Sequence, residues 1–262
     1  MSISRNLYVL FIRPHLKTGL ARQRIKFFWF VWGYFGLCTI KSLSMRARLH
    51  MLFRFLSIDW NVEHAHRPSE ITDVVRILAE RRAKANEGML EAGCFRGGST
   101  AKFSIACKLL GYRLLVFDSF QGVEPRAQEG AGMSYDFSGQ YVASQELVEN
   151  NVARFGERDA CTFYAGWFRD TLAYGDVPGP VRVAYIDCDL AKGTEEALMG
   201  ILPVLSDDGA IFSQDYHIPP VRSLLSDRTL WARFHFPEPH IRRLGANLAC
   251  LTFARTVSTA RV

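Results

Sequence analysis

The segment MLEAGCFRGGST, residues 89–100, decides the fold of this chain. A short apolar run ends in Glu91, glycines follow at positions 93, 97 and 98, and an apolar stretch at residues 101–110 resembles a helix. This order predicts a strand, a tight turn and a helix start. Glycine lets the backbone approach a ligand closely, and a helix N-terminus presents N–H groups without an intrahelical partner.

The glycine spacing distinguishes nucleoside binding from dinucleotide binding. The segment lacks the G-x-G-x-x-G fingerprint of dinucleotide sites. Glu91 would be unfavourable beside a pyrophosphate but suits an amino group or a hydroxyl. We therefore expect a nucleoside without phosphates, such as S-adenosylmethionine, with Glu91 near its positively charged methionyl end. An ordinary strand–loop–helix connection is the structural alternative.

A second acid supports the nucleoside site. Residues 113–118 (RLLVFD) form another buried-strand pattern that ends in Asp118. Asp118 lies 25 residues after Gly93, close to where a Rossmann-type unit places its ribose-binding carboxylate. The long loop that follows, residues 119–139, could close over a ligand.

Strand and helix patterns alternate along the rest of the chain. Strands are expected at 161–165, 181–189 and 210–215, with a closing pair at 233–236 and 246–254. Helices are expected at 69–85, 143–155, 193–205 and 221–231. The alternation predicts an α/β fold, an open and largely parallel sheet with helices on both faces. Ligands of such sheets bind at the carboxyl ends of the strands.

Acidic side chains gather at two of these strand ends. Asp187 and Asp189 end one strand, and Gln214 and Asp215 end the next. Carboxylate and amide oxygens suit Mg²⁺ or Ca²⁺. Mg²⁺ would lower the pKa of a substrate hydroxyl and fix it for attack on a methyl carbon. Solvated acids that only cap loops are the structural alternative.

Three further side chains have candidate roles. His217 could accept a proton, and Asp189 could act as ligand, base or orienting carboxylate. Trp167 follows the third strand, where an adenine could stack on it, although a lone tryptophan is often a core residue.

The positive charge is concentrated near the N-terminus. The net charge is +6, yet residues 1–60 hold ten Lys and Arg against one acid, Asp59, and the remainder is net negative. The basicity therefore belongs to an N-terminal arm, and a nucleic-acid groove across the body is not expected. We expect a helical arm at residues 1–64 and a catalytic domain at 65–262. His64 and His66 have no ligand spacing and are expected to be surface or loop histidines.

The arm contains an uncharged aromatic stretch at residues 27–40. It is shorter than the roughly 20 residues that span a bilayer, and no signal-peptide cleavage site follows. Two interpretations stay open. The arm could lie on a membrane surface, with aromatics in the interface and basic residues on anionic lipid. It could instead fold over the body as a lid or form an oligomer contact, such as a homodimer.

The six cysteines are scattered, without a C-x-x-C pair or a zinc-ligand spacing. This distribution is typical of buried free thiols in a reducing compartment, so a cytoplasmic location is expected.

Several motifs together resemble the macrocin O-methyltransferase family over about residues 65–255. They are EAGCFRGG at 91–98, VFDSFQGV at 116–123, GWFRDTL at 166–172, IDCDL at 186–190 and QDY at 214–216. The resemblance implies a class I methyltransferase fold, Rossmann-like and with a mostly parallel seven-stranded sheet. It also implies S-adenosylmethionine as methyl donor, Mg²⁺ assistance and methylation of a hydroxyl, typically on a natural-product sugar.

The resemblance also implies residue roles. The cofactor site would include Glu91, Gly93, Gly97, Asp118 and Ser119, and the metal ligands would be Asp187 and Asp215. To the cofactor site the sequence adds Arg96 and Trp167. The family usually has two consecutive acids where this chain has Gln214 and Asp215, and an amide oxygen can coordinate but brings no charge.

The leading hypothesis is thus a Mg²⁺-assisted O-methyltransferase acting on a sugar, glycolipid or secondary metabolite. A metal-free methyltransferase with Asp189 and His217 as the base is one alternative. A membrane-surface or scaffold protein with a vestigial cofactor pocket is another.

Overall fold

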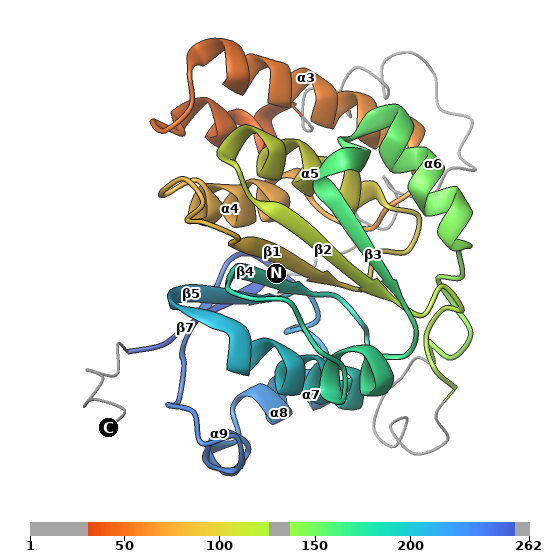
Figure 1. Cartoon of the computed structure of the whole chain (residues 1–262), viewed down its shortest axis with the longest axis vertical. Helices are drawn as coiled ribbons and strands as arrows, with labels where there is room; N and C mark the ends of the chain where they lie inside the picture. The colour runs from red at the N-terminus through yellow and green to blue at the C-terminus, as the bar shows by residue number, and fades with distance from the viewer. Residues whose placement is uncertain (1–30, 126–136, 255–262) are drawn as a thin grey trace, which may run out of the picture.

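The computed structural model describes residues 31–125 and 137–254 of the chain. The first thirty residues of the expected arm and the middle of the expected loop at 119–139 lie outside the described residues. The described part contains a seven-stranded sheet in the order β3-β2-β1-β4-β5-β7-β6 (Figure 1). Its strands are β1 (Gly88–Ala92), β2 (Arg113–Asp118), β3 (Cys161–Ala165), β4 (Val181–Ile186), β5 (Leu205–Ser213), β6 (His240–Arg243) and β7 (Ala249–Thr252).

The sheet is mostly parallel. β3, β2, β1, β4 and β5 pair in parallel, whereas β7 pairs antiparallel with both β5 and β6. The carboxyl ends of the five parallel strands therefore meet along one edge, where open α/β sheets bind ligands. The predicted α/β fold is confirmed.

Helices cover both faces of the sheet (Figure 1). One face carries α3, α4, α5 and α6, and the other carries α7, α8 and α9. Their bounds are α3 (Met45–Asn61), α4 (Pro68–Leu78), α5 (Gly98–Leu110), α6 (Gln145–Phe155), α7 (Ala191–Ile201), α8 (Pro219–Leu225) and α9 (Arg228–Arg233).

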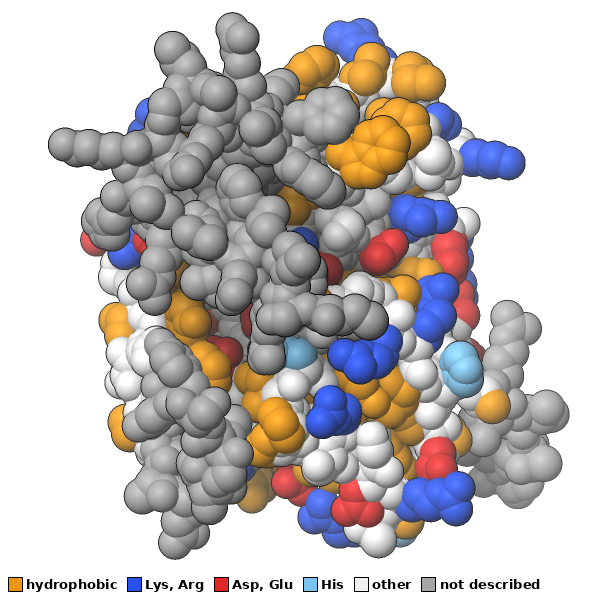
Figure 2. Space-filling model, turned by 180° about the vertical axis from the view of Figure 1, so that it is seen from behind, with side chains coloured by type: hydrophobic (Ala, Val, Ile, Leu, Met, Phe, Trp, Pro, Cys, Tyr) orange, Lys and Arg blue, Asp and Glu red, His pale blue; other side chains and the backbone are white. Residues whose placement is uncertain are grey.

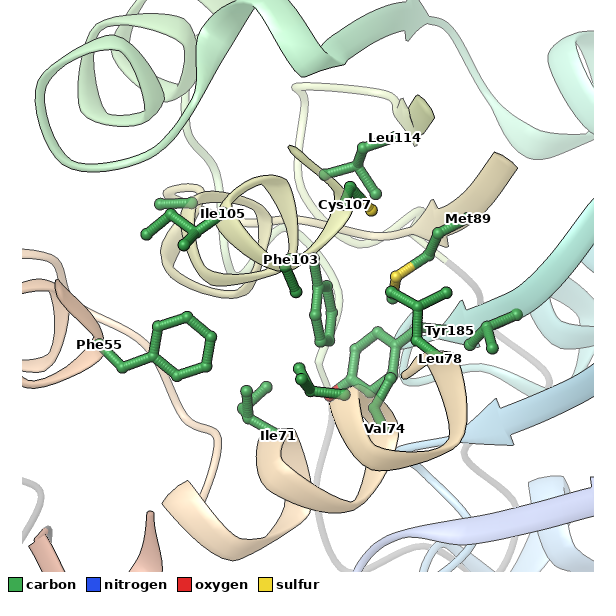
Figure 3. Close-up of a cluster of buried hydrophobic side chains, with 14 of the residues drawn as sticks. Phe55, Ile71, Val74, Leu78, Met89, Phe103, Ile105, Cys107, Leu114 and Tyr185 are labelled. Carbon is green, nitrogen blue, oxygen red and sulfur yellow. The ribbon is translucent and has the colours of Figure 1, made fainter. Parts of the chain in front are cut away.

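Strand periodicity divides the apolar side chains between the two faces. In β2, Leu114 and Val116 join the core under α4 and α5, whereas Leu115 and Phe117 join the core under α7 and α8. Successive strand residues point to opposite faces, so a strand buried on both sides is apolar throughout. Figure 3 shows part of the first of these cores, where side chains of α3, α4 and α5 pack with Met89 of β1, Leu114 of β2 and Tyr185 of β4.

The described part of the arm packs into this same core. α3 starts at the N-cap Ser44, whose side chain accepts from the Ala47 N–H at 3.2 Å. Its residue Phe55 is fully buried among the core side chains (Figure 3). The Arg54 guanidinium donates to the Phe155 and Gly156 carbonyls at the end of α6. Among residues 31–125 and 137–254, no helix is long and apolar enough to cross a membrane.

The expected closing strands were placed wrongly in part. The segment 233–236 is not a strand, because α9 runs to Arg233 and β6 lies at His240–Arg243. β6 is an edge strand with mostly exposed side chains, so it lacks the alternation that marks a half-buried strand. The expected helix at 193–205 is α-helical to Ile201 and continues as a 3₁₀ turn over Leu202–Val204, where Pro203 disfavours a further α-helical turn.

Candidate active site

A pocket of about 280 Å³ opens at the carboxyl edge of the parallel strands. It lies beyond the ends of β1, β2, β4 and β5 and includes residues from the segments that follow them. Predicted site residues that line it are Gly93, Asp118, Ser119, Trp167, Asp187, Asp189, Gln214, Asp215 and His217. Trp167 is half-buried in the pocket wall and not a core residue.

The turn after β1 requires glycine. Gly93 has a φ of +91°, and a Cβ there would meet the Asp187 carbonyl oxygen at 1.8 Å. The Gly93 N–H donates to Phe117 O at 2.9 Å. Gly97, the N-cap of α5, also has a positive φ of +79°. The loop thus passes close to the ends of β2 and β4 and opens the N-terminus of α5 toward the same edge.

Asp118 holds the glycine-rich loop in place. Its Oδ2 accepts from the Cys94 N–H and its Oδ1 accepts from the Phe120 N–H, both at 2.7 Å. Each carboxylate oxygen keeps a further acceptor site. The next residue, Ser119, donates its hydroxyl to Gly122 O at 3.1 Å, so this end of β2 is well ordered by local hydrogen bonds.

Glu91 is a fully buried acid at the end of β1. Neither carboxylate oxygen has a hydrogen-bond partner among the described residues, and the same holds for the Ser99 and Thr100 hydroxyls. Burial raises the pKa of Glu91 to about 8, against the effect of these two hydroxyls, and the charges of Asp187 and Asp118 add to the rise. Glu91 does not line the pocket in this structure, so its contact with the methionyl end of a cofactor stays a prediction.

Two other predicted cofactor residues also do not line the pocket. Arg96 forms an ion pair with Glu63 at 2.7 Å, and both side chains are about half exposed. Gly97 lies at the N-cap of α5, facing Val148 of α6.

Three carboxylates crowd the other side of the pocket. Asp215 Oδ2 accepts from the Cys188 and Asp189 N–H groups, both at 2.8 Å, and Asp189 has a φ of +62°. Burial is the main reason that the pKa of Asp187 and of Asp215 rises to about 7 and that of Asp189 to about 9. Negative charges nearby add to the rise: Glu70 and Asp118 act on Asp187, and the carboxylate of Asp187 acts on both Asp189 and Asp215. Within the described ranges, no three acidic, histidine or cysteine side chains are arranged as a metal site.

The surroundings of Gln214 differ from those expected for a metal ligand. Its amide oxygen accepts from the Tyr185 hydroxyl at 3.0 Å, and its amide nitrogen donates to Glu70 Oε2 at 3.1 Å. Both ends of the amide therefore belong to a buried network with Tyr185 and Glu70. The assignment of Gln214 as a metal ligand stays a prediction.

His64 and His66 lie in the loop between α3 and α4, as expected, but neither side chain is at the surface. Both side chains are more than nine-tenths buried. His66 lines the pocket, and its Nε2 lies 2.8 Å from Asp187 Oδ2. The sequence gave no signal for this contact, because the partners are 121 residues apart. Sequence reasoning also missed Phe137, Tyr141 and Asn247, which line the same pocket.

Residues 67–237, more than half of the chain, match the macrocin O-methyltransferase (TylF) family. The chain belongs to this family. S-adenosylmethionine is the methyl donor expected for this family of methyltransferases. The free cysteines of the chain agree with the sequence prediction, since none of the six forms a disulfide.

The chain is also similar to a curated enzyme of Streptomyces olivaceus, 8-demethyl-8-(2,3-dimethoxy-alpha-L-rhamnosyl)-tetracenomycin-C 4'-O-methyltransferase. The two are 31% identical over 148 residues, which is 53% of this chain and 56% of the relative. The match thus spans about half the length of each protein.

Solved structures share the fold. The O-methyltransferase NovP aligns with a TM-score of 0.64 and 20% identity, over 74% of this chain and 84% of its own. The calicheamicin methyltransferase CalS11 aligns with a TM-score of 0.52 and 15% identity, over 92% and 96%. The methyltransferase PaMTH1 of Podospora anserina, solved with S-adenosylhomocysteine, aligns with a TM-score of 0.50 and 12% identity, over 78% and 87%.

The buried acid Glu91 makes the stability depend on pH. Its pKa of about 8 exceeds the roughly 4.3 of an unfolded glutamate. At a pH between these two values, Glu91 is therefore protonated in the folded protein and ionised in the unfolded chain. The contribution of Glu91 to the free energy of unfolding therefore falls as pH rises through this window, by at most about 1.4 kcal/mol per pH unit. We predict that Glu91→Gln becomes progressively more stable than the wild type between pH 5 and 8, measured by urea unfolding. A difference that stays constant with pH, as expected for the exposed control Glu146→Gln, would contradict this.

Proposed function

We propose that this enzyme transfers the methyl group of S-adenosylmethionine to a hydroxyl of a sugar on a natural product or related glycoside. The main support for the proposal is the arrangement of residues in the pocket. One wall is the glycine-rich loop with Asp118, which suits a nucleoside, and the other is the carboxylate group of Asp187, Asp189 and Asp215. The family and the rhamnoside-methylating relative support a sugar hydroxyl as acceptor.

One wall of the pocket suits the methyl donor, and the other suits the acceptor hydroxyl. We assign the cofactor ribose to Asp118, because its carboxylate oxygens keep free acceptor sites for two hydroxyls. Trp167 is placed to pack on the adenine or on the acceptor. The acceptor oxygen forms a bond to the methyl carbon while the bond from that carbon to the sulfonium sulfur breaks, which leaves S-adenosylhomocysteine.

The hydroxyl proton must leave during this transfer. We assign it to Asp189 or His217, which both line the pocket on the side of the acids. Asp215 fixes the backbone that carries Asp189, because it accepts from the Asp189 N–H. Because this contact uses the backbone N–H of Asp189, the carboxylate oxygens of Asp189 are not needed for it.

We propose Mg²⁺ as an additional component of the site. The donor chemistry fits, since Asp187 and Asp215 supply hard oxygen ligands and their like charges are crowded in a buried place. When bound, the ion would lower the pKa of the acceptor hydroxyl. Gln214 would be the third ligand through the second lone pair of its amide oxygen, because the first accepts from the Tyr185 hydroxyl. A metal-free reaction that uses Asp189 and His217 is the competing proposal.

The cofactor assignment is tested by calorimetry with S-adenosylhomocysteine. We predict that the wild type binds it and that Asp118→Ala weakens the binding by roughly 10- to 100-fold, as expected for one or two lost hydrogen bonds to a charged group. Asp170→Ala, which changes an exposed acid that does not line the pocket, is the matched control. Methyl transfer is then assayed with S-adenosylmethionine on nucleotide-linked and aglycone-linked rhamnosides. Absence of S-adenosylhomocysteine binding to the wild type would overturn the proposed function.

The metal assignment predicts that chelator abolishes methyl transfer and that added Mg²⁺ restores it. Asp187→Ala and Asp215→Ala should each lower turnover by at least about 100-fold, while S-adenosylhomocysteine affinity stays within a few-fold. Turnover that persists in excess chelator would favour the metal-free reaction with Asp189 and His217.

We also propose that the N-terminal arm lies against an anionic membrane surface. The outer side of α3 exposes Met45, Leu49, Phe53 and Trp60, with Phe53 and Trp60 67% and 72% exposed. Figure 2 shows hydrophobic side chains gathered at the end of the molecule that α3 occupies. Residues 31–58 contain four basic residues and no acid, which favours anionic lipid over a second copy of the same basic helix. The division into an arm at 1–64 and a catalytic domain at 65–262 stays a prediction.

Co-sedimentation of the full chain with phosphatidylglycerol vesicles tests the membrane surface. We predict that the wild type sediments and that the double variant Phe53→Ser/Trp60→Ser stays mostly in the supernatant. Tyr174→Ser, which changes an 82% exposed aromatic elsewhere, should sediment like the wild type. Equal sedimentation of all three proteins would contradict the proposal. So would a dimer seen by light scattering without lipid that the Phe53→Ser/Trp60→Ser substitutions abolish.

A further inference from the structure

A buried charge cluster joins the arm to the body. Lys102 of α5 is fully buried and forms an ion pair with Asp59 of α3. His64, in the linker between α3 and α4, places its Nε2 2.7 Å from Asp59 Oδ1 and 3.3 Å from Lys102 Nζ. A buried charge without its partner is strongly unfavourable, so these three groups must stay together. The cluster thereby fixes the linker relative to α5.

The backbone of α5 leaves space for this linker. A Cβ on Gly98, in the first turn of α5, would meet the His64 Cβ at 2.8 Å. The missing side chain lets His64 reach Asp59 and Lys102 beside the helix. Gly98 therefore serves the packing of the linker, in addition to any role in the glycine-rich loop.

His66 extends the cluster into the pocket. Its ring stacks on that of His64, with centroids 5.8 Å apart and planes at 11°, and it meets the Tyr185 ring edge-on at 5.8 Å. Two aromatic contacts thus set the ring plane of His66. In this orientation its Nε2 lies 2.8 Å from Asp187 Oδ2, so the Nε2–H tautomer of His66 donates to the carboxylate.

We propose that His66 is a positioning residue for methyl transfer, which it serves by fixing the Asp187 carboxylate at the acceptor side of the pocket. The linker contributes this residue, and the Asp59–Lys102–His64 cluster holds it there. The inference rests on the proposed function, because it assigns Asp187 to that reaction. An orienting hydrogen bond to such a carboxylate typically contributes 10- to 100-fold to activity or metal affinity.

Four proteins test this role: the wild type, His66→Ala, His66→Gln and the control His240→Ala. The Gln side chain can donate from a nitrogen placed like Nε2, whereas Ala cannot. His240 is exposed on the edge strand β6 and lies outside the pocket. We expect His66→Ala to lower kcat about 10- to 100-fold, with S-adenosylhomocysteine affinity and acceptor KM within about twofold of the wild type. His66→Gln should recover most of kcat, and His240→Ala should match the wild type.

A wild-type kcat in His66→Ala would overturn the proposal. So would a His66→Gln variant that binds S-adenosylhomocysteine normally but is as slow as His66→Ala, because a merely packing role predicts no rescue by hydrogen bonding.

A spectroscopic readout separates this inference from the proposed function. In ¹⁵N-histidine-labelled protein, the His66 Nε2–H should resonate far downfield and should move when Asp187 is changed to Asn. If the wild type methylates no glycoside, the acceptor class fails, but this signal still decides the His66–Asp187 contact. A His66 signal that Asp187→Asn leaves unchanged would overturn the inference.

Discussion

The close approach of Gly93 to the Asp187 carbonyl is the constraint on which the rest of the site depends. No side chain fits at this position, since a Cβ would lie 1.8 Å from that oxygen. The approach brings the end of β1 against the end of β4, and it directs the following loop past Asp118. Because of this one turn, the glycine-rich loop with Asp118 and the acids Asp187, Asp189 and Asp215 line the same pocket.

The acidic wall is stabilised from three directions. Backbone N–H groups hold Asp215, the linker residue His66 meets Asp187, and the Tyr185–Gln214–Glu70 network lies in the buried layer beneath. Several carboxylates are thus kept close together although their repulsion raises their pKa values. An arrangement that retains such repulsion is more easily explained by chemistry than by stability.

The arm and the catalytic body are physically continuous. α3 buries Phe55 in the core that the α4 and α5 side chains share with the sheet, and the Asp59–Lys102 pair adds a buried charge contact to α5. The linker that leaves α3 then reaches the pocket itself. A segment that resembles a surface appendage in sequence therefore supports one wall of the active site.

The sequence by itself determined the α/β class, the two strand-end acids Glu91 and Asp118, and the family, because strand periodicity, glycine turns and motifs are local patterns. It also brought Asp187, Asp189 and Asp215 to one edge, since parallel strands share their carboxyl ends. Only the tertiary structure decided which groups these acids meet. The contact of His66 with Asp187 and the pairing of Gln214 with Tyr185 and Glu70 join distant segments, and nothing in the local pattern encodes them. The edge strand β6 escaped sequence reasoning for a related reason, because its pairing with β7 defines it and its own exposed side chains do not.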